Sequence, residues 1–312
     1  MANRYLPVGC FGKLPIWPEY MEAGTSYPAA RALKQWLHGG REHAGMEDPE
    51  GGRADTEVRA HLRLLIGVPG STELLVGVLR PSGDQGGRSF PFSVFSLIPR
   101  KLYGKHYPLL PLALSPIWDA LEDAWDSLAG VATKGAFEEL LESLEVPHPA
   151  PLNEVKAVYQ GRQRESTGPL LAREDGASLG RALGNMPALL NRLRKGSDAE
   201  GLLVELPVSR EPDGACFDTS VWIDLVNRQF RLKRFDPLVF LDASRVPADR
   251  RLLLKFGALR PSDYSAIMAL RDDGGAMARP AHAEPGKEDG ASPDPAPPTY
   301  VELLGRKLSA KG

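Results

Sequence analysis

The chain has 312 residues, of which 42% are hydrophobic and 25% charged, a composition typical of globular proteins that predicts one large domain or two modest ones. Its 38 Lys and Arg residues nearly balance 40 Asp and Glu residues, which gives a formal net charge of −2. This balance excludes a protein that binds nucleic acid through an overall positive field, so we expect no nucleic-acid partner.

The number of cysteines and the length of the apolar runs indicate the cellular compartment. Cys10 and Cys216 are too few for a disulfide framework, which favours a reducing environment. The N-terminus lacks the apolar run of a signal peptide, and the runs 74–79 and 109–114 are far shorter than a membrane-spanning helix. We therefore expect a cytoplasmic protein without membrane insertion.

The first third of the chain predicts one helix followed by three strands. The helix covers 26–37, with Ser26 as its candidate cap and Pro28 in its first turn. A Gly- and Glu-rich stretch at 39–56 predicts a long surface loop. The strands are joined by a short turn and a longer loop, which predicts an antiparallel meander, and they cover 61–68, 73–79 and 90–98.

The rest of the chain mixes helical and strand patterns. In the strongest helix, apolar residues repeat at steps of three and four, and Ser115 can cap its start. Short runs rich in Val, Ile and Leu predict further strands. The predicted helices are 115–129, 136–144, 178–193 and 247–256, and the predicted strands are 202–206, 220–225 and 238–241.

A change of composition near residue 271 predicts the end of the folded domain, 1–271. Residues 272–298 are rich in Pro, Gly, Ala and acidic side chains, and Met277 is their only large apolar residue, so we expect a disordered linker. Residues 299–312 regain helical spacing behind a capping pattern at Thr299, which predicts a short amphipathic tail helix.

The familiar catalytic patterns are absent from the sequence. It contains no phosphate-binding loop, no dinucleotide fingerprint and no nucleophile elbow, and its six histidines lack the spacing of metal ligands. The sequence therefore predicts an interaction protein rather than an enzyme, with no catalytic residue, metal or cofactor.

Two Gly- and Pro-rich clusters, 9–15 and 80–92, stand out from this background. In the second, Asp84 can accept backbone N–H groups, and Arg88 can either pair with Asp84 or reach outward. Phe90 and Phe92 are two residues apart, so we expect both rings on one core face. From the residues alone, the simplest interpretation of this cluster is a structural hairpin loop.

The two clusters resemble the motifs of the TagF/ImpM family of type VI secretion accessory proteins. The family's aromatic-Gly-Lys-Leu-Pro start corresponds to Phe-Gly-Lys-Leu-Pro at 11–15. The resemblance is concentrated in 8–100 and is looser up to 268, where it rests on element order and on Trp222 in a late strand. The family's second motif, Pro-Ser-x-Asp-x-x-Gly-Arg-x-Phe-Pro, is filled by Pro81, Ser82, Asp84, Gly87, Arg88, Phe90 and Pro91.

One departure from the family follows the first motif. Family members usually continue with a Gly-Asp-Phe stretch, whereas this chain has Ile-Trp-Pro-Glu-Tyr at 16–20. We expect Glu19 to take the acidic position and Tyr20 the aromatic one.

The resemblance implies both a fold and a function. The fold is an α/β sandwich (α+β) in which a largely antiparallel sheet is flanked by helices. The function is that of a non-enzymatic accessory protein that represses type VI secretion after translation. The implied partner is the forkhead-associated-domain protein of the same system, in opposition to a kinase/phosphatase pathway.

The motifs together predict one composite partner-binding surface. Its alternatives are a hydrolase that uses Ser82 or Asp84, and a nucleotide-binding scaffold that contacts phosphate through the N–H groups of Gly86 and Gly87. Phe90, Pro91 and Trp222 are expected to be structural. The predicted surface consists of Gly12, Lys13, Leu14 and Pro15 beside Pro81, Ser82, Asp84, Gly87 and Arg88.

Overall fold

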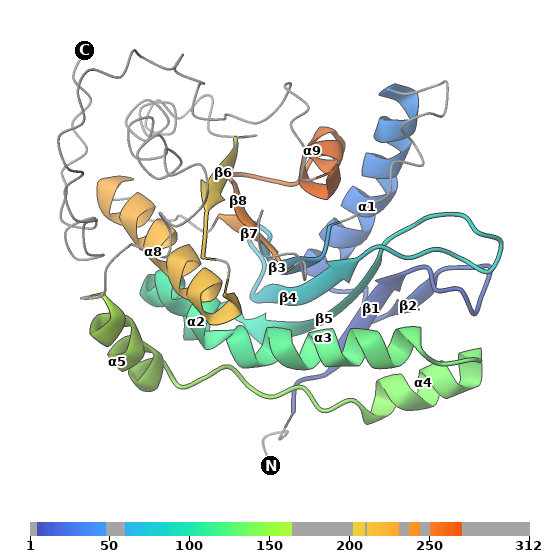
Figure 1. Cartoon of the computed structure of the whole chain (residues 1–312), viewed down its shortest axis with the longest axis horizontal. Coiled ribbons are helices and arrows are strands. Elements are labelled where there is room, and N and C mark those ends of the chain that lie inside the picture. Colours follow the sequence, from blue (N-terminus) through green and yellow to red (C-terminus); the bar gives the residue numbers. More distant parts are fainter. Residues whose placement is uncertain are drawn as a thin grey trace, which may run out of the picture.

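The computed structural model describes residues 5–47, 60–163, 202–209, 211–230, 237–243 and 250–269. Within these residues, eight strands form a single antiparallel sheet in the order β2-β1-β5-β4-β3-β7-β8-β6 (Figure 1). The strands are β1 (Val8–Gly12), β2 (Met21–Ala23), β3 (Leu62–Gly67), β4 (Glu73–Arg80), β5 (Phe92–Pro99), β6 (Leu203–Pro207), β7 (Leu238–Asp242) and β8 (Arg251–Lys255).

Helices cover both faces of the sheet, which confirms the predicted α/β sandwich (Figure 1). One face packs against α1 and α9, and the other packs against α2, α3, α4, α5 and α8. The helices are α1 (Pro28–Glu47), α2 (Leu110–Ala113), α3 (Ser115–Ala129), α4 (Lys134–Ser143), α5 (Leu152–Arg162), α8 (Pro212–Phe230) and α9 (Tyr264–Ala269), with short 3-10 turns at Arg100–Leu102, Gly104–Leu109 and Pro261–Asp263. No helix in the described ranges is long and apolar enough to span a bilayer.

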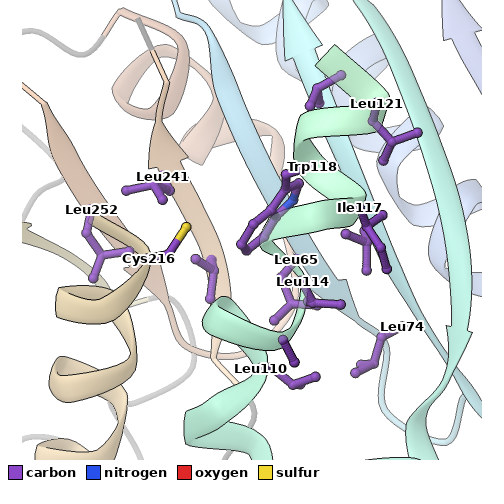
Figure 2. Close-up of a cluster of buried hydrophobic side chains, with 14 of the residues drawn as sticks. Leu65, Leu74, Leu110, Leu114, Ile117, Trp118, Leu121, Cys216, Leu241 and Leu252 are labelled. Atoms are coloured by element: carbon purple, nitrogen blue, oxygen red, sulfur yellow. The ribbon is translucent and has the colours of Figure 1, made fainter. Parts of the chain in front are cut away.

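The predicted meander is present as β3, β4 and β5. Alternation along β4 divides the core, because successive side chains of a strand point to opposite faces. Val76 packs on the α3 face, whereas Leu75 packs on the α1 face. Trp118 of α3 is fully buried between the helix and the sheet (Figure 2), and its Nε1 donates to the backbone oxygen of Leu64 at 3.2 Å.

The structure corrects the predicted start of α3 and the predicted end of α1. α3 covers the predicted residues, but Leu114 is its N-cap, so Ser115 is the first helical residue and does not cap. α1 runs to Glu47, ten residues beyond the predicted end, so 39–47 is helix rather than loop. A Cβ atom on Gly40 would lie 2.4 Å from a carbon of Tyr264, so the glycines that suggested a loop instead allow a close contact with α9.

The predicted strand at 220–225 is wrong, because these residues lie within α8. Val221, Trp222 and Leu225 are all buried between the sheet and neighbouring helices. A short apolar run cannot distinguish a buried helix from a buried strand by its periodicity. Trp222 is therefore a core residue of a helix, where its Nε1 donates to the backbone oxygen of Pro207 at 2.7 Å.

The predicted helix at 247–256 is also wrong, because Arg251–Lys255 forms β8. β8 lies between β7 and β6, with Leu253 on the α1 face and Leu252 and Leu254 on the opposite face. Pairing with two neighbouring strands outweighs the helical propensity of Leu, Arg and Lys here. The predicted helix 178–193, linker 272–298 and tail helix 299–312 lie outside the described residues.

Candidate functional site

The second motif forms a compact loop between β4 and β5 that is organised by Asp84. The Asp84 Oδ1 atom accepts hydrogen bonds from the backbone N–H groups of Gly86 and Arg88, each at 2.9 Å. The backbone oxygen of Asp84 accepts from the N–H of Gly87 at 3.0 Å. Gly87 has a φ of 80°, which glycine adopts without strain. The loop therefore has the carboxylate-to-backbone contacts that the sequence predicts.

The first motif joins this loop through an ion pair. Lys13 Nζ lies 2.6 Å from Asp84 Oδ2, which also accepts from Arg88 Nε at 2.6 Å. The Asp84 and Lys13 side chains are buried, whereas 68% of the Arg88 side chain is exposed. The hydrogen bond from Lys13, followed by those from Arg88, holds the pKa of Asp84 well below its usual range. The predicted proximity of the two motifs is confirmed by these contacts.

Gly12 explains how the two motifs approach so closely. It ends β1 directly opposite Phe92 of β5 and has a φ of 140°. A Cβ atom at this position would lie 2.2 Å from the backbone oxygen of Pro91, so any other residue would push the strands apart. The neighbouring Leu14 side chain is fully buried in the core on the α3 face.

The segment 14–20 between β1 and β2 is held against the second motif. Its anchor is the backbone oxygen of Pro18, which accepts from Lys13 Nζ at 3.3 Å and from the Arg88 guanidinium at 3.1 Å. A turn precedes this anchor, because the N–H of Trp17 donates to the oxygen of Leu14 at 3.2 Å. The two motifs therefore fix the shape of the segment in which the chain departs from the family pattern.

Four aromatic rings pack together beside the ion pair: Phe11, Tyr20, His38 and Phe90. Tyr20 is at the centre and stacks on Phe11 with ring centroids 5.5 Å apart. Its centroid also lies 5.0 Å from that of Phe90 and 4.8 Å from that of His38, both in edge-to-face arrangements. Lys13 Nζ lies 4.9 Å from the centroid of the Tyr20 ring. Burial, followed by the charge of nearby Lys34, lowers the pKa of His38, which favours its neutral form.

Phe90 and Phe92 do not share a core face, contrary to the prediction. Phe90 packs on the α1 face, whereas Phe92 packs on the α3 face near Phe137. The alternation rule fails because β5 begins only at Phe92, so Phe90 and Pro91 precede the regular strand. Both rings are nevertheless buried, as expected of structural residues.

The predicted surface residues divide into an exposed and a buried set. Pro15, Gly87 and Arg88 are exposed, and Pro81 and Ser82 are half-buried. Trp222 lies apart, within α8. The buried set consists of Gly12, Lys13, Leu14 and Asp84. The motif is therefore brought together in space, but nearly half of its predicted members are covered.

The contacts of this loop bear on the two alternatives. Within the described residues, the Ser82 hydroxyl has no hydrogen-bond partner that could serve as a base. The N–H groups of Gly86 and Gly87, which a phosphate would need, already donate to Asp84. The described part of the chain also has no group of three or more His, Cys, Asp or Glu side chains arranged to hold a metal ion.

The sequence does not predict that Pro18, His38 and Tyr20 contribute to this site. It indicates Tyr20 only as a substitute for a family aromatic, and His38 only as one of six histidines that lack the spacing of metal ligands. The available signal was the spacing of aromatic residues in a Pro-rich segment next to a motif lysine. The contact with Pro18 involves a backbone oxygen, which no sequence pattern reveals.

The chain is similar to a described protein family and to a solved structure. Residues 9–145 match the family described as "TagF N-terminal domain, Type VI secretion system-associated". Among solved structures, PA0076 from Pseudomonas aeruginosa PAO1 is 26% identical, with a TM-score of 0.37. That match covers 46% of this chain and 64% of PA0076, so this chain spans less than two thirds of the length of PA0076. No curated protein matches the chain.

The family match contains both motifs, the ion pair that joins them, and α1, α3 and α4. The match over residues 9–145 supports the predicted resemblance of this part of the chain to the TagF family of type VI secretion system-associated proteins.

Proposed function

We propose that this protein is a cytoplasmic, non-enzymatic repressor of type VI secretion that acts after translation by binding the forkhead-associated-domain component of that system. The family match supports a role in type VI secretion. The repressor role and the partner come from the resemblance of the two motifs to the TagF/ImpM family.

The observation that carries the proposal is the internal use of the motif's charged groups. Both oxygens of the Asp84 carboxylate are occupied, one by two backbone N–H groups and the other by Lys13 and Arg88. A carboxylate with a strongly lowered pKa is a poor general base. This arrangement favours a rigid surface made of two loops, which suits protein recognition better than catalysis.

The experiment compares secretion in cells that lack the gene with secretion in cells that express it again. Deletion should raise secretion of a type VI substrate, and the unsubstituted chain should restore repression. Purified protein should also capture the forkhead-associated component. Deletion that leaves secretion unchanged, or lowers it, would contradict the repressor role.

Ser82→Ala separates this proposal from the hydrolase alternative. Since the Ser82 hydroxyl makes no contact with a base in the described residues, the variant should repress secretion as well as the unsubstituted chain. Loss of repression by a well-folded Ser82→Ala protein would favour catalysis instead. A nucleotide-binding scaffold predicts heat on titration with ATP or GTP, whereas the proposed function predicts none.

A further inference from the structure

Two exposed aromatic residues lie on the segment that the motifs hold in place. Trp17 and Tyr20 are each 38% exposed, and only Tyr27 and Val158 are other exposed large apolar residues in the described ranges. Trp and Tyr at a protein surface are enriched among the residues that dominate binding energy at interfaces. Two of them, three residues apart in one segment, mark this region for recognition.

Contacts with both motifs and with neighbouring side chains hold the segment 14–20 in place. Both Lys13 and Arg88 donate to the backbone oxygen of Pro18, which lies between the two aromatic residues. Tyr20 is also packed against three other rings, and the Trp17 ring lies 5.1 Å from Lys134 Nζ. A surface that is already ordered loses little conformational entropy when it binds.

We propose that the partner contacts Trp17 and Tyr20, together with the exposed Arg88 guanidinium, and that Lys13 and Asp84 are positioning residues. This inference rests on the proposed function and deepens it. The Lys13 and Asp84 side chains are too well buried to contact another protein directly. They act by fixing the backbone at Pro18 and the position of Arg88.

The chemistry of this surface defines the complementary surface on the partner. A guanidinium has five N–H donors, and the described contacts of Arg88 use its Nε and one terminal nitrogen. Its remaining donors lie on a largely exposed side chain and can form a charge-assisted pair with a carboxylate. The partner therefore presents an apolar patch for the two rings with a carboxylate beside it.

The decisive experiment measures binding of the purified chain to the purified forkhead-associated component by titration calorimetry. Trp17→Ala and Tyr20→Ala should each weaken binding at least about tenfold. Tyr27→Ala is the matched control, because Tyr27 is 48% exposed but lies at the start of α1, and it should change binding by less than about twofold. Since Tyr20 is part of an aromatic cluster, Trp17→Ala is the more informative variant.

Salt dependence tests the carboxylate on the partner. Binding of the unsubstituted chain should weaken as salt is raised, because partly exposed ion pairs are screened. This dependence should be smaller for Arg88→Ala. Equal salt dependence of the two proteins would overturn the proposed pairing with a carboxylate.

Amide hydrogen exchange tests the positioning role of Lys13. Lys13→Met should speed exchange in 15–20 and weaken binding, although residue 13 does not lie on the contact surface. Trp17→Ala should weaken binding while exchange in the loop 83–87 stays unchanged. If Lys13→Met alters neither exchange in 15–20 nor binding, Lys13 is not a positioning residue.

The outcomes distinguish this inference from the proposed function. If the unsubstituted chain binds and Trp17→Ala and Tyr20→Ala bind equally well, the surface is wrong and the proposed function stands. If the unsubstituted chain does not bind the forkhead-associated component, both the partner and the surface proposed for it are overturned.

Discussion

Two of the charged clusters in the described residues, one at the motif and one between β3 and α3, differ in which partner is buried. At the motif, the carboxylate of Asp84 is buried, and the exposed partner is the arginine, Arg88. Between β3 and α3 the arrangement is reversed, because Arg63 is buried while Asp119 is 59% and Glu122 is 22% exposed. Arg63 lies 2.7 Å from an oxygen of each acid.

The difference predicts which residue of each cluster the protein can lose. A buried charge that loses its partner costs far more than an exposed one, because the exposed group returns to water. The acids that pair with Arg63 can do so, whereas Asp84 cannot. The motif cluster should therefore be the more sensitive of the two to removal of its cation.

The largest expected effect on stability comes from buried aromatic rings near these clusters rather than from the charges. Phe90→Ala beside the motif and Trp118→Ala beneath Arg63 each empty a buried position, and each should lower the free energy of unfolding by about 3–5 kcal/mol. Chemical denaturation measures both. A loss below about 1 kcal/mol for either variant would show that its cluster does not depend on the ring.

Replacing the buried cation of each cluster tests the comparison directly. Lys13→Met leaves the buried Asp84 with only Arg88 and backbone donors. Arg63→Met should lower the free energy of unfolding by about 1–2 kcal/mol, and Lys13→Met should lower it by more. The double variant Lys13→Met/Asp84→Asn should recover part of the loss, because both charges are then gone. Equal losses in the two single variants would refute the distinction between the clusters.

The pH dependence of stability follows from the lowered pKa of Asp84. Its folded pKa lies below the unfolded value of about 3.9, so the ion pair stabilises the protein above that value and loses this effect as pH falls toward the folded pKa. The difference in stability between the unsubstituted chain and Asp84→Asn should be constant from about pH 7 to 5 and shrink below about pH 4. Melting curves across that range measure it. A difference that shrinks near neutral pH would mean that another group is responsible.

The difference between contacts that are local and contacts that are distant in the sequence explains how much of the fold is predictable. The meander β3–β4–β5 was predicted because turns punctuate short alternating strands, and these are local signals. The run at 220–225 has the pattern of a strand, because its burial in α8 comes from packing on several sides. The sequence of β8 favours a helix, because its pairing with β6 and β7 involves residues far away in the sequence.

For the site, the sequence predicted the pairing within one loop better than contacts across the fold. The bond between Asp84 and Arg88 spans four residues and follows from loop chemistry. The bond between Lys13 and Asp84 joins residues 71 positions apart and was expected only as proximity of two motifs. The shared anchor at the oxygen of Pro18 was not predictable, because it depends on the path of the backbone.

The smallest expected effect on stability is that of Arg88→Ala. The side chain is 68% exposed, so its ion pair is screened by solvent, and Asp84 keeps Lys13 and two backbone donors when the guanidinium is removed. The variant should lose roughly 1 kcal/mol or less, so its melting curve should nearly overlay that of the unsubstituted chain.

Binding gives the contrasting readout for the same protein. Because Arg88 is largely exposed and donates to the Pro18 oxygen, between Trp17 and Tyr20 in the sequence, Arg88→Ala should capture less of the forkhead-associated component and should raise secretion. One preparation, divided between a thermal melt and a pull-down, measures both properties. A folded variant that binds and restrains secretion as well as the unsubstituted chain would remove Arg88 from the contact surface. A variant with a far lower melting temperature would show that the exposed arginine, like Lys13, is needed to balance the buried carboxylate.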